Sequence, residues 1–338
     1  MKKMFRDHCI VFFLVLGFGA FPLLASAQTH IAQGKPIRII VPFGAGGIAD
    51  LTARLVGQKL SEQLGQPVVI ENKPGAGGIV GGEAVAKGEA DGSVLLLMSN
   101  ASAVSTGLFK KLPFDVQKDF APISSLGFFD LALVSSVAGA GSNPSNTVTK
   151  IANITDLLTY ARANPGKLNV GSINIGSTQN LAAELLKTQA GIEFQVVPYN
   201  GTPALLTGLR SGDIDVAIEI LGPLMPQIDA KVVRPLATMG KVRANGIGNV
   251  PTAIEAGIAG FQVTSWNMLA APTATPKAVI TRLQIEIAKV LALSDVKKRM
   301  AELHVEARVS TPEEASELLA SEIKRWGDVI VRAKIPKQ

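Results

Sequence analysis

Cysteine and histidine are almost absent from this chain of 338 residues. The single cysteine, Cys9, lies in a segment that we expect to be removed, so the mature protein has no disulfide, no thiolate metal site and no cysteine nucleophile. The histidines left after that removal, His30 and His304, form no His-x-x-x-His pair for a metal. A Gly-x-Ser-x-Gly turn and a Walker lysine are also missing. The sequence therefore predicts a protein that is not an enzyme and binds no metal and no cofactor.

Strong charge and aromatic side chains are also scarce. Phe, Trp and Tyr make up 5% of the chain, whereas Gly, Ala, Leu and Val abound, which suits close packing of helices on a sheet. The expected leader holds three basic residues and one acidic residue, so its removal lowers the net charge from +6 to +4. The remaining Lys and Arg residues are scattered, and this weak charge predicts no nucleic-acid partner.

The first residues have the order of parts typical of a secretory signal peptide. Lys2, Lys3 and Arg6 are followed by an apolar run from Ile10 to Leu24, and residues 25–27 supply the small side chains of a cleavage site. The run is shorter than the roughly 20 apolar residues that a membrane-spanning helix needs. We therefore predict that residues 1–27 are a signal peptide and that the mature protein lies in a bacterial periplasm.

Short apolar runs alternate with helical patterns along the rest of the chain. Ile37 to Val41 is rich in β-branched residues and lies between two prolines, which indicates a buried strand, and residues 51–60 have helical spacing. This alternation predicts an α/β fold with mainly parallel sheets flanked by helices. We expect further strands at 68–71, 94–98, 131–134, 168–171, 194–197, 216–218 and 261–271, a surface loop at 135–149, and helices at 79–87, 177–189, 203–210, 276–293, 296–303 and 312–332.

This pattern makes two α/β units, which we expect to form two lobes with a ligand cleft between them. The final helices follow a strand, and we expect no further strand after them, so they can pack back on the first unit. The predicted first lobe is discontinuous and comprises residues 34–128 and 255–338. The second lobe comprises residues 129–254.

Two glycine-rich loops join strands to helices in the first unit. Gly44, Ala45, Gly46 and Gly47 come directly before a helix, and a second loop at 74–78 includes Gly77 and Gly78. Glycines allow close approach of a ligand to backbone amides, and a helix N-terminus favours an anion. Both loops could also be simple tight turns. Asp50, in the first turn of the helix, is a further candidate, although its simpler role is to stabilise the helix N-terminus.

The first loop permits a rival interpretation. Gly44-x-Gly46-x-x-Ala49 satisfies a loose dinucleotide fingerprint, and Glu71 ends the second strand where a ribose-binding acid would lie. Asp50 argues against this alternative, because it would place a negative charge beside the pyrophosphate. Export to a compartment where no nicotinamide cofactor is expected argues against it too.

The middle unit has matching polar loops. Residues 171–179 join a strand to a helix, with Ser177 as an expected N-cap, and residues 199–202 precede Pro203, a helix-starting proline. Hydroxyls, amides and free backbone donors suit a ligand rich in oxygen. Capping alone would also explain Ser177 and Thr202, and the two roles are compatible.

At these positions the chain resembles the Bug receptors, the substrate-binding proteins of tripartite tricarboxylate transporters. The resemblance extends from Pro36 to about Ala333. It is carried by motifs at residues 41–50, 65–69, 71–78, 90–92, 111–115, 118–122, 164–168, 197–199, 250–252, 255–257 and 265–266.

The resemblance implies a two-lobed fold of the type II periplasmic-binding-protein kind, which closes on its ligand. It also implies that one ligand carboxylate is held by the loop from Phe43 to Gly47. The rest of the ligand would meet Gly77, Gly78, Ser99, Asn100, Gly176, Ser177, Thr178, Asn200, Gly201 and Thr202. The chain departs from the family pattern at Glu219-Ile220, where relatives usually carry Asp-Asn, and in a longer loop at 135–146.

We therefore expect a monomeric periplasmic receptor that binds a small carboxylate and docks on a membrane permease. The sequence does not choose between a dicarboxylate, an amino acid, an aromatic acid and an amide. If Glu219 faces the cleft, it would favour an amine or a hydroxyl. Two alternatives are a sensor subunit that acts on a signalling partner such as a histidine kinase, and a periplasmic enzyme that uses cleft carboxylates.

Overall fold

The computed structural model describes residues 31–137 and 151–338, so the predicted signal peptide and most of the predicted loop at 135–149 lie outside the described residues. The elements of the described residues are η1 (Ile31–Gly34), β1 (Ile37–Val41), α1 (Ile48–Leu64), β2 (Val68–Asn72), η2 (Ala76–Gly78), α2 (Ile79–Ala86), β3 (Val94–Ser99), α3 (Asn100–Leu108), β4 (Phe120–Ser136), α4 (Ile154–Ala163), β5 (Asn169–Ile173), α5 (Thr178–Ala190), β6 (Gln195–Tyr199), α6 (Thr202–Ser211), β7 (Val216–Ile220), α7 (Leu221–Asp229), β8 (Val233–Thr238), β9 (Thr264–Pro272), α8 (Lys277–Ala292), α9 (Ser294–Glu302), β10 (Val305–Ala307) and α10 (Pro312–Arg332).

The strands form one sheet in the order β2-β1-β3-β9-β4-β7-β5-β6, and β8 and β10 both pair with β4. β1 pairs in parallel with β2 and β3, and β5 pairs in parallel with β6 and β7. β4 and β9 run antiparallel to their neighbours. We call the part around β1–β3, β9 and β10 the first lobe and the part around β5–β8 the second lobe. The predicted α/β fold with flanking helices is confirmed, but the sheets that we expected to be mainly parallel form one mixed sheet, because β4 and β9 run antiparallel to their neighbours.

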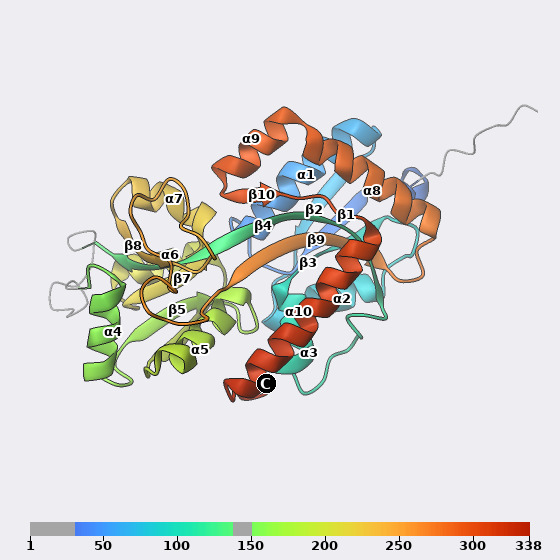
Figure 1. The fold of residues 1–338 in the computed structure, drawn as a ribbon. Helices are drawn as coiled ribbons and strands as arrows, with labels where there is room; N and C mark the ends of the chain where they lie inside the picture. Colours follow the sequence, from blue (N-terminus) through green and yellow to red (C-terminus); the bar gives the residue numbers. More distant parts are fainter. Residues whose placement is uncertain (1–30, 138–150) are drawn as a thin grey trace, which may run out of the picture.

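Strand β4 crosses from one lobe to the other (Figure 1). Its residues from Phe120 to Asp130 pair with β9, and those from Leu131 to Ser135 pair with β7. The sequence predicted only residues 131–134 of this strand, because the earlier part is interrupted by proline, glycine and serine residues that break the apolar pattern. The strand also continues through Ser136, so the predicted loop begins later than expected.

The C-terminal helices pack on the first lobe, as predicted. Helix α8 contacts α1 and β4, and α10 contacts α3 and β4. Figure 1 shows α1, α8 and α9 on one side of β3 and β9, with α3 and α10 on the other. The expectation that no strand follows these helices was wrong, because β10 pairs antiparallel with β4 between α9 and α10. Three residues are too short to show a period in sequence. Helices α3 and α7 and strand β8 were also missed.

Local chemistry explains several helix ends. Helix α1 ends at Gly65, whose φ of 62° is a left-handed conformation that glycine adopts without strain. The side chain of Ser177 accepts a hydrogen bond from the amide of Asn180, which confirms it as the N-cap of α5. Thr311 and Glu314 form a capping box at α10. Of these ends, the one at Ser177 belongs to a strand-to-helix loop of the site, between β5 and α5.

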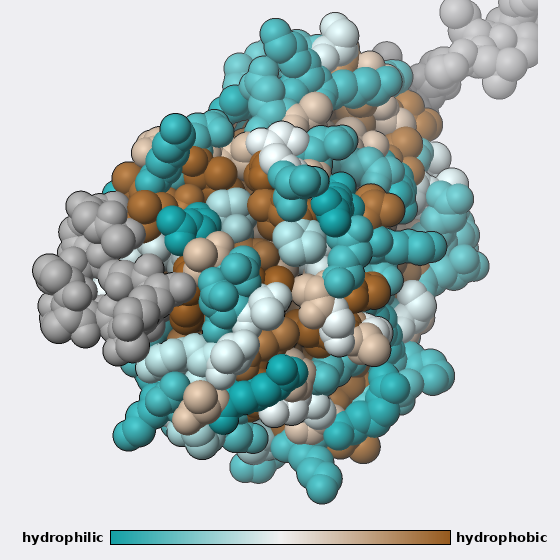
Figure 2. Space-filling view, turned by 60° about the vertical axis from the view of Figure 1, so that its left-hand side comes forward, coloured by the Kyte–Doolittle hydropathy of each residue, from teal (hydrophilic) through white to brown (hydrophobic). Residues whose placement is uncertain are grey.

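The surface is ordinary for a chain of this composition. On the face shown in Figure 2, hydrophilic side chains project between hydrophobic ones. Large apolar side chains that are exposed, such as Val80, Val242 and Val331, lie on separate elements. Within the described residues, no helix combines the length and the apolarity that crossing a membrane would require.

Candidate functional site

A small cavity lies between the lobes at the carboxyl ends of β1, β3, β5 and β7. The space open to the centre of a water molecule inside it is about 30 Å³. The predicted site residues that line it are Phe43, Gly44, Gly47, Ser99, Thr178, Gly201, Thr202 and Glu219. The lining residues that sequence reasoning did not name as candidates are Ile48, Ala49, Phe129, Ile173, Gln179, Ile220, Ser265 and Asn267.

Five helices begin at this cavity. The first residues of α1, α5 and α6 line it, and so do Ser99 and Ile220, the N-caps of α3 and α7. Helices α1 and α6 begin after Gly47 and Gly201, and neither N-cap makes a side-chain hydrogen bond to its helix. The first amides of a helix have no intrahelical acceptor, and their dipoles add up to a partial positive charge. The cavity is therefore suited to an anion.

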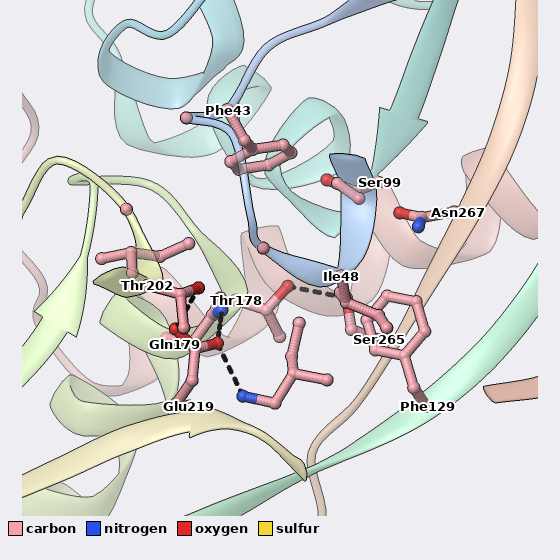
Figure 3. A pocket seen from close by; sticks show the side chains of 16 residues that line it. Phe43, Ile48, Ser99, Phe129, Thr178, Gln179, Thr202, Glu219, Ser265 and Asn267 are labelled. Atoms are coloured by element: carbon pink, nitrogen blue, oxygen red, sulfur yellow. Dashed lines mark hydrogen bonds between the residues drawn. The ribbon is translucent and has the colours of Figure 1, made fainter. Parts of the chain in front are cut away.

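The second-lobe wall is built around Glu219, whose side chain is buried (1% exposed). Its Oε1 accepts hydrogen bonds from Gln179 Nε2 at 2.6 Å and from the Ile220 amide at 2.7 Å, and its Oε2 accepts one from Thr202 Oγ1 at 2.8 Å. Figure 3 shows Gln179 and Thr202 beside the carboxyl group of Glu219. Burial raises the pKa of Glu219 above its ordinary value, although the three hydrogen bonds oppose that rise.

The first-lobe wall carries a polar side chain without a partner. Asn267, in β9, is 1% exposed, and neither its Nδ2 nor its Oδ1 has a hydrogen-bond partner among the described residues. It pairs in register with Ser99 of β3, and Figure 3 shows these two on the side of the cavity away from Glu219. A buried amide without a partner costs stability, so such a group calls for an explanation. A contact with the ligand would supply one.

The two lobes touch each other around the cavity. The Gly77 amide donates a hydrogen bond to the Ile175 carbonyl at 2.9 Å, and the Thr178 and Ser265 hydroxyls are 3.0 Å apart. A Cβ built on Gly44 would lie 3.1 Å from the Asn200 carbonyl oxygen. The lobes thus approach each other closely around the cavity, and their separation would widen access to it.

Asp50 does not line the cavity but fixes the loop that does. It is 3% exposed and accepts hydrogen bonds from the Gly46 amide, Arg54 Nε and Asn72 Nδ2, each at 3.0 Å. Burial alone would raise the pKa of Asp50, but the bonds from Arg54, Gly46 and Asn72 together hold it below its ordinary value. Because Arg54 pairs with Asp50, a ligand carboxylate beside α1 would not face an unpaired negative charge there.

The other predicted site residues lie around the cavity and not on its lining. Gly77 and Gly176 meet where the lobes touch, and the Asn100 side chain donates to the Thr264 carbonyl. Ser177 caps its helix and donates to the Ile173 carbonyl. The complete set outside the lining is Ala45, Gly46, Asp50, Gly77, Gly78, Asn100, Gly176, Ser177 and Asn200.

Some of the lining residues that we did not predict could have been found from the sequence, whereas others could not. Gln179 ends a polar loop that was identified, and Asn267 directly follows the motif at 265–266, so both could have been found by extending those segments. Phe129, Ile173 and Ile220 look like any buried strand residue. Strand pairing brings them to the cavity, since Ile220 pairs with Leu131 of β4 and Phe129 pairs with Ser265 of β9.

Glu71 does not serve the dinucleotide alternative. Arg38 Nη2 donates to Glu71 Oε2 at 2.9 Å, so the acid that would bind a ribose already holds a guanidinium group. Among the described residues, no three His, Cys, Asp or Glu side chains are grouped to hold a metal ion.

A model of the family described as "Tripartite tricarboxylate transporter family receptor" matches residues 52–335. The chain belongs to this family. The resemblance to Bug receptors is confirmed, since the protein BugT of Bordetella pertussis is 32% identical over 90% of this chain and 90% of BugT. The receptor family is periplasmic and binds solutes.

Solved structures support the same fold for this receptor. Rpa4515 of R. palustris, solved with adipate, has a TM-score of 0.83 and 30% identity, and the match covers 90% of this chain and 99% of Rpa4515. MatC of Rhodopseudomonas palustris, solved with bound malate, has a TM-score of 0.79 and 29% identity, and the match covers 88% of this chain and 99% of MatC.

Proposed function

We propose that this receptor captures a small carboxylate in the cavity between its lobes and delivers it to the membrane permease of a tripartite transporter. The observation that carries this proposal is that two helices, α1 and α6, begin without side-chain caps at the same cavity between the lobes. Backbone amides at Gly47 to Ala49 are the donors that would hold the carboxylate. The adipate and malate in the two related structures support a carboxylate ligand.

Binding and closure are coupled in this proposal. The ligand enters while the lobes are apart, and closure brings Thr178 to Ser265 and Gly77 to Ile175. A ligand stabilises the closed form only by the contacts that it makes there and not in the open form. The permease would then recognise the closed receptor.

The remaining expectations from the sequence belong to this proposal. They are a monomer, a leader cleaved after Ala27, a first lobe of residues 34–128 and 255–338, and a second lobe of residues 129–254. The change in the pairing of β4 between Asp130 and Leu131 supports a boundary close to 128.

Thermal unfolding of the mature protein with a panel of small carboxylates and their amides tests the proposal. A ligand at 100 times its Kd stabilises by about 2.7 kcal/mol, which corresponds to a rise in Tm of about 5–10 °C for a domain of this size. We expect a rise for at least one acid and none for its amide. A rise for amides alone, or for a dinucleotide, would overturn the carboxylate assignment.

A further inference from the structure

We propose that the ligand of this receptor carries an ammonium group in addition to its carboxylate, and that Glu219 binds this group. The inference rests on the proposed function, because the carboxylate is assigned to the start of α1. It goes further by naming the class of ligand, a small amino acid in the broad chemical sense.

The cavity has little charge of its own. Glu219 is the only ionisable residue among those that line it. The cations closest in sequence to the glycine loop are engaged elsewhere, since Arg54 binds Asp50 and Arg38 binds Glu71. A buried carboxylate is stable when it is paired with a positive charge or well hydrogen-bonded. The lining side chains supply hydrogen bonds but no cation, so a cation beside Glu219 would have to come from the ligand.

The hydrogen bonds to Glu219 are divided unequally between its two carboxyl oxygens. The Ile220 amide and the Gln179 Nε2 group can only donate, and both point at Oε1. Oε2 accepts from Thr202 alone, so it retains one acceptor site. This arrangement holds the carboxyl group as an acceptor and fixes its orientation. An ammonium group is a donor with three hydrogens and fits the free site on Oε2.

The charge of Glu219 also disfavours ligands that carry a second carboxylate. A second ligand carboxylate at this wall would face Glu219 in a cavity that has no lysine, arginine or histidine on its lining. Like charges at close range in such a space repel strongly. Asn267, on the opposite wall, is uncharged and could bind either kind of ligand, so Glu219 is the residue that discriminates. Dicarboxylates such as those bound in the related structures should therefore bind poorly here.

Matched ligand pairs test the inference without any mutation. The ammonium acids are alanine, β-alanine, 4-aminobutanoate and 5-aminopentanoate, and the partners in which a carboxylate replaces the ammonium group are methylmalonate, succinate, glutarate and adipate. Calorimetry and thermal unfolding of the mature protein at pH 7 would compare each pair. We expect at least one ammonium acid to bind more tightly than its dicarboxylate partner by about 10-fold or more, as for a charge-assisted hydrogen bond.

The substitution Glu219→Gln keeps the shape of the side chain and removes its charge. We expect this substitution to lower the affinity for the ammonium acid by about 10- to 100-fold and to raise the affinity for its dicarboxylate partner. Glu317→Gln, on the exposed face of α10, is the matched control and should leave both affinities unchanged. If Glu219→Gln does not fold, the ligand pairs on the unmodified protein still decide the question.

The failures of the two proposals are distinct. Tighter binding of a dicarboxylate than of its ammonium partner would overturn the ammonium inference and leave carboxylate capture standing. Binding of neither class, with binding of amides instead, would overturn both.

Discussion

The two walls of the cavity are built in different ways. The first-lobe wall offers the backbone of Phe43, Gly44 and Gly47 and the unpartnered amide of Asn267. The second-lobe wall offers side chains that are already bonded to one another, with Gln179 and Thr202 holding Glu219. One wall has open hydrogen-bonding groups, whereas the other has its groups fixed before any ligand arrives.

This difference separates two tasks. Backbone amides at a helix N-terminus bind any carboxylate in much the same way, so the first-lobe wall suits a whole family of acids. A buried charge in a fixed orientation discriminates between ligands, because the wrong partner leaves it unpaired or repelled. We therefore expect substitutions in the second-lobe wall to affect stability strongly, and substitutions in the first-lobe wall to affect mainly binding.

The largest effect is expected from Gln179→Leu. This change removes the Nε2 donor at 2.6 Å from a buried carboxyl group, and loss of a hydrogen bond to a charged group lowers the free energy of unfolding by about 1.5–3 kcal/mol. Urea denaturation at pH 7 measures it. Gln189→Leu, on the exposed part of the same helix, is the control. Equal stability of the two variants would show that the Glu219 network does not hold this wall together.

The carboxyl groups behind the two walls should respond to pH in opposite directions. Because burial raises the pKa of Glu219 above 4.5, the folded state binds its proton more tightly than the unfolded state, and stability falls as pH rises above about 4.5 through the folded pKa. Glu219→Gln should remove this fall. Free energies of unfolding should be measured from pH 3 to pH 8. As pH rises, the stability of the variant should increase relative to that of the unmodified protein.

Asp50, which fixes the first-lobe loop, has a lowered pKa because the bonds from Arg54, Gly46 and Asn72 outweigh its burial. Its contribution to stability is present above its ordinary pKa of 3.8 and is lost as pH falls through the lower folded pKa. The same titration should show Asp50→Asn less stable than the unmodified protein at neutral pH, with the difference closing below pH 3.8. A difference that widens in acid would contradict this account.

Much of the fold and part of the site follow from the sequence, for physical reasons that particular residues show. Gly44, Thr178 and Thr202 were found because parallel strands bring their carboxyl ends to one edge, and these residues follow such strands. Gln179 and Asn267 were missed because their roles depend on partners far away in the chain, Glu219 and Ser99. Strand β4 was predicted too short because its pairing with four other strands overrides a weak local pattern.

A smaller effect, with opposite signs for stability and binding, is expected from Asn267→Leu. Leucine has a similar volume and needs no hydrogen bond, so the ligand-free protein should be unchanged or more stable by up to about 1 kcal/mol. Ligand affinity should fall roughly fivefold, as for loss of one hydrogen bond of about 1 kcal/mol. Thermal unfolding with and without ligand measures both. A loss of stability without any loss of affinity would make Asn267 a structural residue only.

The smallest effect is expected from Gly44→Ala, which tests closure and not the chemistry of either wall. The added Cβ would lie 3.1 Å from the Asn200 carbonyl oxygen in the closed form, so one lobe must shift by a few tenths of an ångström. In the open form this contact is absent, and Gly44 is not among the glycines with positive φ, so the open protein should be as stable as before.

Because only the closed form is affected, ligand affinity should fall by about twofold to fivefold, at the low end of the cost of overpacking. The control is Gly327→Ala in α10, where a Cβ meets no atom within 4 Å and alanine favours the helix. Calorimetry on both variants gives the comparison. If Gly44→Ala bound as tightly as Gly327→Ala, the approach of the first-lobe loop to Asn200 would not be part of the ligand-bound state, and the carboxylate would have to be held with the lobes further apart.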